Sequence, residues 1–185
     1  MKTIDIEISG ISPILQHRFA IDNGEAKGPT KKNKNQQTDD VEQSLYRLQD
    51  GKIFQPAIHL LSAMKKAGAK FQIPGQRKQT YKNLIGSGAV IISPSDIVHR
   101  YQEYAVHVCS VVVPATKGRI IRRRPMLPKW ALSFQLEYDD LEIGEKDIRE
   151  ILDYAGKCVG IGDWRPEKGG SFGRFLVSKF KEQKS

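Results

Sequence analysis

The stretch IDIEIS at residues 4–9 alternates strictly between isoleucine and a polar residue. A period of two residues is typical of a strand that buries one face and exposes the other. The stretch LSFQLEY at residues 132–138 repeats this pattern. Because the apolar face of such a strand needs a cover, the chain has to supply helices that pack on one side of a sheet.

Two segments have the helical pattern that this cover requires. In residues 56–71 the apolar side chains recur at every third or fourth position, and the lysines lie off that stripe. The stripe consists of Leu60, Met64, Ala67 and Phe71. Residues 145–157 form a second amphipathic pattern, and Gly156 stands where a helix commonly ends in glycine.

The remaining strand signals complete the order of elements. Residues 89–94, 104–114 and 171–180 are rich in β-branched and aromatic side chains. Residues 118–130 have the pattern of a basic, proline-interrupted connection. The order of strand, helix, two strands, helix and strand is the βαββαβ arrangement. The sequence therefore predicts an α+β fold, a ferredoxin-like (RRM-like) antiparallel sheet with its helices on one face.

A polar segment at about residues 20–40 interrupts this order. It has almost no apolar content and many turn-forming residues, which predicts a mobile surface insertion. A short helix is expected at residues 39–48, with Asp39 or Asp40 as its N-cap, followed by a turn at Asp50–Gly51. We expect residues 1–185 to form a single domain, because too little chain precedes the insertion to fold alone.

The charge of the chain is positive and unevenly distributed. The sequence has 30 Lys and Arg against 21 Asp and Glu, a net charge of +9. Residues 51–95 contain seven basic residues and no acid, residues 104–136 contain six and no acid, and eight acids gather in residues 137–153. This distribution predicts a basic face that suits a polyanion and a separate acidic face. The alternative is a set of solvated lysines that only maintain solubility.

Several other classes of protein are disfavoured. No apolar run approaches the roughly 20 residues of a membrane-spanning helix, and the N-terminal residues do not form a signal peptide. Cys109 and Cys158 lack a metal-ligand or redox spacing, which predicts reduced cysteines in a cytoplasmic protein. Asp139, Asp140 and Glu142 have the pattern of a solvated acidic turn, so neither a metal nor a cofactor is expected.

The stretch GIGDWRPEKGGSFGRF at residues 160–175 is the strongest candidate for a binding site. Glycine permits a close approach of phosphate, and successive backbone N–H groups can form an anion-binding concavity. The cations of this stretch are Arg165, Lys168 and Arg174. Trp164 and Phe172 offer ring faces for an unstacked base. The alternative is a glycine-rich turn with Trp164 in the core, and the spacing is that of neither a Walker loop nor a dinucleotide fingerprint.

Further basic residues extend the predicted surface. His17 and Arg18 follow the first strand, and the lysines of residues 65–70 lie on the outer side of the first helix. If residues 119–124 form a strand, Arg122 and Arg124 point one way and Arg123 the other. The predicted nucleic-acid-binding residues are His17, Arg18, Lys65, Lys66, Arg77, Lys78, Lys117, Arg119, Arg122, Arg123, Arg124, Trp164, Arg165, Lys168, Gly170, Phe172 and Arg174. His59 and His107 are predicted to be packing residues.

Three motifs resemble the CRISPR-associated RAMP superfamily, and within it the RNA-binding backbone subunits. The G-x-G…G-G-x-x-G-R-F pattern at residues 160–175 is similar to the glycine-rich loop of that superfamily. The stretch ISGISPILQHRF at residues 8–19 is similar to the first strand of the backbone subunits, and FQPAIHLLSAMKKAGAKF at residues 54–71 to the helix that follows it. The resemblance also allows a small phage or mobile-element relative.

The resemblance implies RNA binding on a ferredoxin-like sheet, with self-association along a guide-type RNA or with other effector subunits as partners. Our first hypothesis is therefore a non-catalytic, single-stranded RNA-binding protein that contacts phosphates. The second is a metal-independent endoribonuclease of the same superfamily with His17 as general base. The third is a phage protein that binds single-stranded DNA or mediates assembly.

Overall fold

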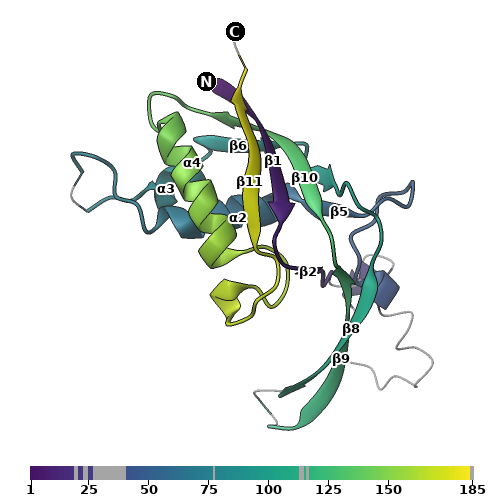
Figure 1. Cartoon of the computed structure of the whole chain (residues 1–185). Coiled ribbons are helices and arrows are strands. Elements are labelled where there is room, and N and C mark those ends of the chain that lie inside the picture. Colours follow the sequence, from purple (N-terminus) through teal and green to yellow (C-terminus); the bar gives the residue numbers. More distant parts are fainter. Residues whose placement is uncertain are drawn as a thin grey trace.

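The computed structural model is built around a four-stranded antiparallel sheet (Figure 1), with the strand order β11-β1-β10-β6. The residues that the structure describes are 1–18, 21–22, 25–26, 41–76, 78–112, 115 and 117–183. The four strands are β1 (Lys2–Gly10), β6 (Val90–Ser93), β10 (Ala131–Tyr138) and β11 (Phe175–Glu182). The two strands with the alternating pattern lie in the centre, where each has two neighbours.

The helices α2 (Ala57–Gly68) and α4 (Glu145–Tyr154) cover one face of this sheet (Figure 1), and the short α3 (Tyr81–Gly86) packs on α2. The alternation in β1 explains why only one face is covered. Ile4, Ile6 and Ile8 are buried in the core, whereas Asp5 and Glu7 remain partly exposed on the other face. The predicted α+β class, with helices on one face, is confirmed.

A long hairpin projects from the end of the sheet (Figure 1). It consists of β8 (Ala105–Val112) and β9 (Arg119–Leu127), and the two-residue strand β2 (Ile14–Leu15) pairs with β9 at its base. The predicted connection at residues 118–130 was therefore wrong. The carbonyl oxygen of Pro125 accepts from the Gln16 N–H, so it points away from β8. The backbone nitrogen of a strand residue points to the same side as its carbonyl oxygen. The N–H that proline lacks is therefore not one that would bond β8, and the ladder between β8 and β9 is not interrupted.

Smaller elements occupy the first half of the chain. β3 (Ile21–Asp22) pairs with β4 (Glu25–Ala26), and β5 (Phe54–Pro56) pairs with β7 (Asp96–Val98). The rest of the predicted insertion lies outside the described residues, as do Asp39 and Asp40. The helix expected at residues 39–48 extends only to residue 43, and the chain then turns. The turn at Gly51, whose φ is 85°, is confirmed.

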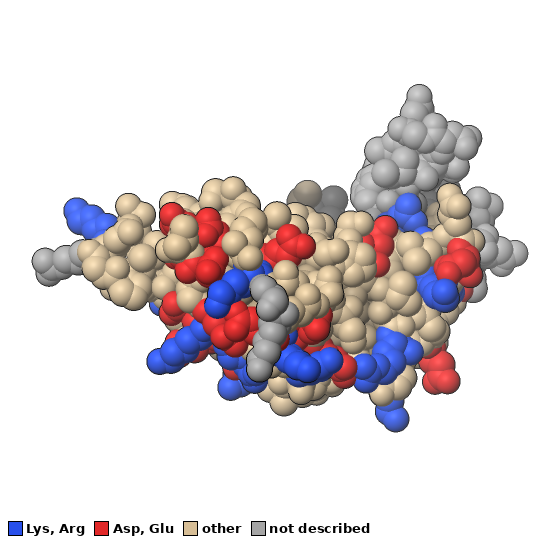
Figure 2. Space-filling model, turned by 90° about the horizontal axis from the view of Figure 1, so that it is seen from above, with Lys and Arg blue, Asp and Glu red and all other residues tan. Residues whose placement is uncertain are grey.

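The end of the sheet that carries both termini has mixed charge. Figure 2 shows Lys and Arg side chains interspersed with Asp and Glu on this face. Two ion pairs lie at this end: Asp140 of the 137–153 stretch with the N-terminal amine at 3.3 Å, and Glu182 with Lys2 at 2.8 Å. On this face the predicted separation of acidic from basic side chains was wrong, because the N-terminal amine and Lys2 lie beside the acids.

Gly156 does not end α4, contrary to the prediction. The helix continues into the π-helical turn Ala155–Val159 and ends at Gly160, which has a φ of 72°. A Cβ added at Gly156 would lie 2.2 Å from the carbonyl oxygen of Phe175. This glycine therefore allows the end of the helix to touch the start of β11.

We expect Gly156→Ala to lower the free energy of unfolding by about 1–3 kcal/mol, because the methyl group forces two backbone segments apart. Gly86→Ala is the matched control, since a Cβ there would meet only the flexible end of Lys65. Urea unfolding of both variants measures the difference. Equal stability of the two variants would contradict the close approach.

Candidate nucleic-acid interface

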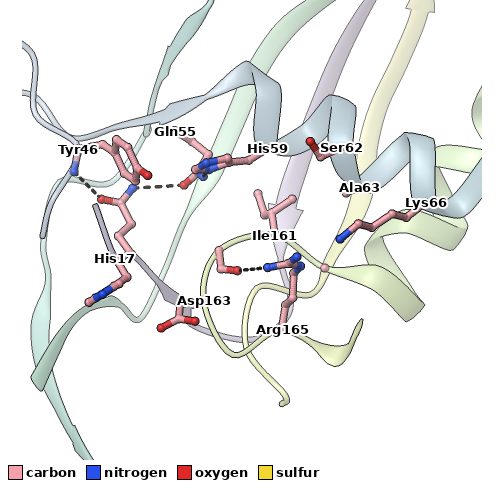
Figure 3. A pocket seen from close by; sticks show the side chains of 13 residues that line it. His17, Tyr46, Gln55, His59, Ser62, Ala63, Lys66, Ile161, Asp163 and Arg165 are labelled. Atoms are coloured by element: carbon pink, nitrogen blue, oxygen red, sulfur yellow. Dashed lines mark hydrogen bonds between the residues drawn. The ribbon is translucent and has the colours of Figure 1, made fainter. Parts of the chain in front are cut away.

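A pocket of about 420 Å³ lies between α2, the glycine loop (residues 160–173) and the end of β2 (Figure 3). Helix α2 contributes side chains from positions that share one face, i, i+3, i+4 and i+7. These are His59, Ser62, Ala63 and Lys66. The loop contributes Asp163 and Arg165 from the opposite side, and Gln16 and Gln55 form the inner wall.

Four of the five glycines of the loop, all except Gly169, permit close packing that a side chain would block. A Cβ at Gly162 would lie 2.5 Å from the Leu15 carbonyl oxygen, and one at Gly173 would lie 1.7 Å from the Ile161 carbonyl oxygen. The N–H groups of Gly160, Gly169, Gly170 and Gly173 all donate to carbonyl oxygens. Because four of the five glycine N–H groups are used within the protein, side chains are favoured over the glycine backbone as contacts for an anion.

The two aromatic rings of the loop join it to the hairpin. Trp164 and Phe172 stack with their ring centroids 5.8 Å apart, and His107 of β8 packs edge-on against both. Trp164 is nevertheless 39% exposed. The alternative in which Trp164 lies in the core is therefore wrong: the indole packs against the hairpin and stays partly accessible.

The arginines of β9 divide between its two faces. In the antiparallel pairing Arg122 and Arg124 lie opposite Cys109 and His107, on one face, and Arg123 lies on the other. Arg124 is largely buried, with its Nε atom 2.5 Å from the Asp163 carboxylate, in an ion pair without the alignment of a hydrogen bond. Arg124 thereby fastens the hairpin to the glycine loop, while Arg122 and Arg123 are exposed.

The structure brings His17, Lys66 and Arg165 to the pocket, and it distributes the other predicted cations elsewhere. Lys65 points toward α3 at Gly86, and the Arg174 guanidinium donates to the Lys157 carbonyl oxygen at 3.3 Å. Lys117 and Arg119 lie near the tip of the hairpin. Exposed positions outside the pocket are also taken by Arg18, Lys78 and Lys168. Gly170 lies under Trp164, and Arg77 is outside the described residues.

Glu167 reduces the positive charge at the pocket. Its carboxylate lies 2.6 Å from the Lys66 Nζ and 2.7 Å from the Arg165 guanidinium. Burial acts to raise the pKa of Glu167, but the hydrogen bonds from Lys66 and Arg165 outweigh it and hold that pKa below its usual value. Two cations therefore share one anion, and this group of three side chains carries one net positive charge.

Three polar side chains at the inner wall, Gln16, Gln55 and Tyr46, were not predicted from the sequence. Gln16 and Gln55 are almost fully buried and hydrogen-bonded to each other at 3.2 Å, and Gln55 contacts the Nδ1 atom of His59 at 2.5 Å. The ring of Tyr46 packs edge-on against His59. Each glutamine stands next to apolar residues in the sequence, so no periodic pattern marks it. Its role arises from contacts between distant segments.

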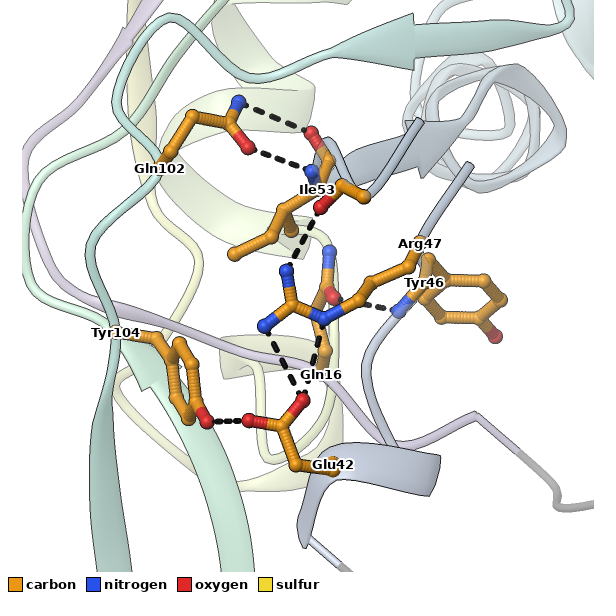
Figure 4. Close-up of polar contacts among 8 residues, drawn as sticks. Gln16, Glu42, Tyr46, Arg47, Ile53, Gln102 and Tyr104 are labelled. Atoms are coloured by element: carbon orange, nitrogen blue, oxygen red, sulfur yellow. Dashed lines mark hydrogen bonds and ion pairs between the residues drawn. The ribbon is translucent and has the colours of Figure 1, made fainter. Parts of the chain in front are cut away.

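The segment that carries Tyr46 is fixed by its own polar contacts (Figure 4). The Arg47 guanidinium donates to the Glu42 carboxylate and to the Gly51 carbonyl oxygen, and Glu42 accepts from the Tyr104 hydroxyl. Gln102 bonds both the N–H and the carbonyl oxygen of Ile53. These contacts hold Tyr46 against the inner wall of the pocket.

Two histidines near the pocket favour the neutral form. Burial lowers the pKa of His17 at the pocket rim, and Arg122 and Arg124 lower it further, while Asp163 raises it in part. Burial lowers the pKa of His99, which is 2% exposed, to about 4. The Nε2 atom of His99 lies 3.4 Å from the Gln16 amide nitrogen, behind the inner wall.

In the described part of the chain no helix is long and apolar enough to cross a membrane. The same residues contain no group of three or more His, Cys, Asp or Glu side chains placed to hold a metal ion.

Comparison with known proteins finds a shared fold and no family in sequence. No family model matches the chain, and no curated protein matches it in sequence. Forty-six chains of solved structures match. One belongs to a cryo-EM structure of the type III-B Cmr-beta complex bound to cognate target RNA, with a TM-score of 0.58 and 14% identity. A second belongs to a type IV-B CRISPR complex, with a TM-score of 0.50 and 9% identity.

The alignments cover almost the whole of this chain. The match to the Cmr-beta chain covers 99% of this chain and 61% of the other, so this chain spans about three-fifths of that relative's length. The match to the type IV-B chain covers 95% of this chain and 90% of the other. At such low identity the likeness establishes that this chain shares its fold with chains of CRISPR complexes.

The buried His99 predicts acid sensitivity. An unfolded histidine titrates near pH 6.5, whereas folded His99 resists protonation down to about pH 4. Below pH 6.5 the unfolded state binds the proton first, so the stabilisation is complete above pH 6.5 and is lost as the pH falls toward 4. The expected loss is about 3 kcal/mol. Urea unfolding at pH 7 and pH 4 measures it, and His99→Gln, which removes the titrating group, should lose correspondingly less. Equal losses would contradict the assignment.

Proposed function

We propose that this chain binds single-stranded RNA without cutting it, chiefly through phosphates. The observation that carries the proposal is the pocket in which Lys66 of α2 and Arg165 of the glycine loop face each other, with His17 at the rim. Ammonium and guanidinium groups suit phosphate oxygens. The exposed Arg122, on the same face of β9 as Arg124, extends the positive surface from the pocket onto the hairpin.

The comparisons support the choice of nucleic acid. One neighbour is a complex bound to its target RNA, and we propose RNA as the ligand of this chain as well. We further propose that the chain is a cytoplasmic RAMP-like protein, that residues 1–185 form one ferredoxin-like domain, and that it associates with other subunits or with itself along the RNA. The strand order β11-β1-β10-β6, with α2 and α4 on one face, supports the ferredoxin-like assignment.

The proposed binding mode differs from that of an RRM. An RRM stacks bases on aromatic side chains of the open sheet face. Here that face carries Asp5 and Glu7 on β1 and Ser133 and Gln135 on β10, none of which offers a ring. The pocket and the hairpin lie instead at one end of the sheet, so we place the RNA there.

The second candidate function is RNA cleavage with His17 as general base. It is favoured by the lowered pKa of His17, which leaves the imidazole neutral and able to accept a proton at pH 7. Incubation of RNA without added metal is the test. Cleavage that His17→Ala abolishes would favour this function over simple binding.

We expect Lys66→Ala/Arg165→Ala to weaken binding of a single-stranded RNA at least tenfold, because two phosphate contacts are lost. Each contact contributes about 0.7 to the slope of log K against log salt, so the slope should fall by about 1.4. Fluorescence anisotropy at several salt concentrations measures both quantities.

The matched control is Lys82→Ala/Lys146→Ala, which removes the same charge from exposed positions on α3 and α4. Equal losses of RNA affinity in the two double variants would mean that net charge alone determines binding. That result would contradict the proposal that the pocket binds the RNA. A parallel titration with DNA of the same sequence tests the choice of RNA.

Glu167→Gln is expected to strengthen RNA binding about threefold to tenfold, because it removes the anion that lies against Lys66 and Arg165. The control is Glu150→Gln, whose carboxylate lies 3.8 Å from Lys146 on α4. Weaker binding by Glu167→Gln would contradict the proposal that phosphate competes with this carboxylate.

A further inference from the structure

The pocket has two chemically different ends. Lys66 and Arg165 make one end cationic, whereas the other end is formed by uncharged amides and by the rings of His59 and Tyr46 (Figure 3). His59 and Lys66 are seven residues apart on α2, which is about 10 Å along the helix axis. The volume of about 420 Å³ lies within the range of small-ligand sites.

The backbone fixes the orientation of the Gln16 amide. The Tyr46 N–H donates to Gln16 Oε1 at 3.0 Å, and Gln16 Nε2 donates to the Phe54 carbonyl oxygen at 2.8 Å. A reversed amide would bring donor against donor and acceptor against acceptor at both contacts. Gln16 therefore has one allowed orientation, and its nitrogen faces Gln55.

The orientation of Gln55 follows from that of Gln16. Gln55 Oε1 accepts from Gln16 Nε2 at 3.2 Å, which turns the Gln55 nitrogen toward His59 Nδ1, 2.5 Å away. Because an amide nitrogen only donates, Nδ1 has to be the acceptor, and the proton of neutral His59 lies on Nε2. Among the described residues Nε2 has no hydrogen-bond partner, so this N–H is available to a ligand.

The surroundings keep His59 neutral at pH 7. Burial lowers the pKa of His59, and the Arg165 charge lowers it further. The other charged or titratable groups around the pocket are Lys66 on α2, Asp163 and Glu167 of the glycine loop, His17 beyond β2, and Tyr46. Protonation would also place an Nδ1–H against the Gln55 N–H. A neutral donor suits an uncharged acceptor better than it suits a phosphate.

We propose that the pocket takes one nucleotide of the RNA, with its phosphate at Lys66 and Arg165 and a carbonyl oxygen of its base accepting from His59 Nε2–H. Gln16 and Gln55 are positioning residues that fix the tautomer of His59. This inference rests on the proposed function and adds a preference to it. Uracil carries carbonyl oxygens and adenine has none, so the pocket favours uridine over adenosine nucleotides.

The first test needs no RNA. In a protein labelled with ¹⁵N-histidine, NMR should show His59 at pH 7 with a proton on Nε2 and none on Nδ1, and with a pKa below 6.5. A proton on Nδ1, or a charged ring at pH 7, would contradict the relay of hydrogen bonds from Gln16 through Gln55 to His59, whether or not RNA binds. Failure of RNA binding alone would overturn the proposed function and leave this result intact.

The second test compares oligouridylate and oligoadenylate of eight nucleotides. We expect the uridylate to bind at least fivefold more tightly and to shift the His59 Nε2 signal. Gln55→Glu should bring the ratio close to one, because a carboxylate accepts from Nδ1–H and reverses the relay, and it should leave the salt dependence from Lys66 and Arg165 in place.

Gln49→Glu is the matched control, since it makes the same change at an exposed position. His59→Gln is a second variant. Unlike Gln55→Glu it introduces no buried charge, and we expect it to lose the preference for uridylate over adenylate. UMP should compete with the uridylate more strongly than AMP does, because a single nucleotide fills the proposed pocket. This competition shows whether a free nucleotide can occupy the pocket without the rest of an RNA strand. Equal binding of the two oligonucleotides by the wild-type protein would overturn the proposal.

Discussion

The close contact between the glycine loop and the segment around β2 is the constraint on which the rest of the site depends. Gly162 lies against the Leu15 carbonyl oxygen, and the Asp163 N–H donates to the same oxygen at 2.8 Å. This contact places the Asp163 carboxylate beside Arg124 of the hairpin. It also directs Arg165 toward α2, so one backbone contact positions both the pocket and the hairpin.

The positive charge of the chain acts through local geometry. Much of it is paired: Glu167 lies between Lys66 and Arg165, Asp163 holds Arg124, and acids and cations mix at the end of the sheet that carries the termini. A net charge of +9 therefore says little about where an anion would bind. The pocket stands out because two cations from separate segments face a hollow whose inner wall is neutral and buried.

The elements with strong local patterns were predictable, and those set by distant contacts were not. Ile4, Ile6 and Ile8 alternate in the sequence and lie in the core, and the stripe of α2 is buried through Leu60 and Met64. Strand β9 was missed because Pro125 and the arginines obscure its alternation. Gly156 was assigned to a helix end, whereas its role depends on Phe175 of a strand that follows much later.

The sequence by itself determined the α+β class, the sites of α2 and α4, and the presence of a glycine-rich loop with cations, because periodicity and residue type are local properties. Only the tertiary structure decided which cations share a surface, since that depends on how β2, α2 and the loop meet. It also decided that Gln16, Gln55 and His59 form one hydrogen-bonded relay. Hydrogen-bond partners far apart in the chain leave no periodic trace, and geometry alone brings them together.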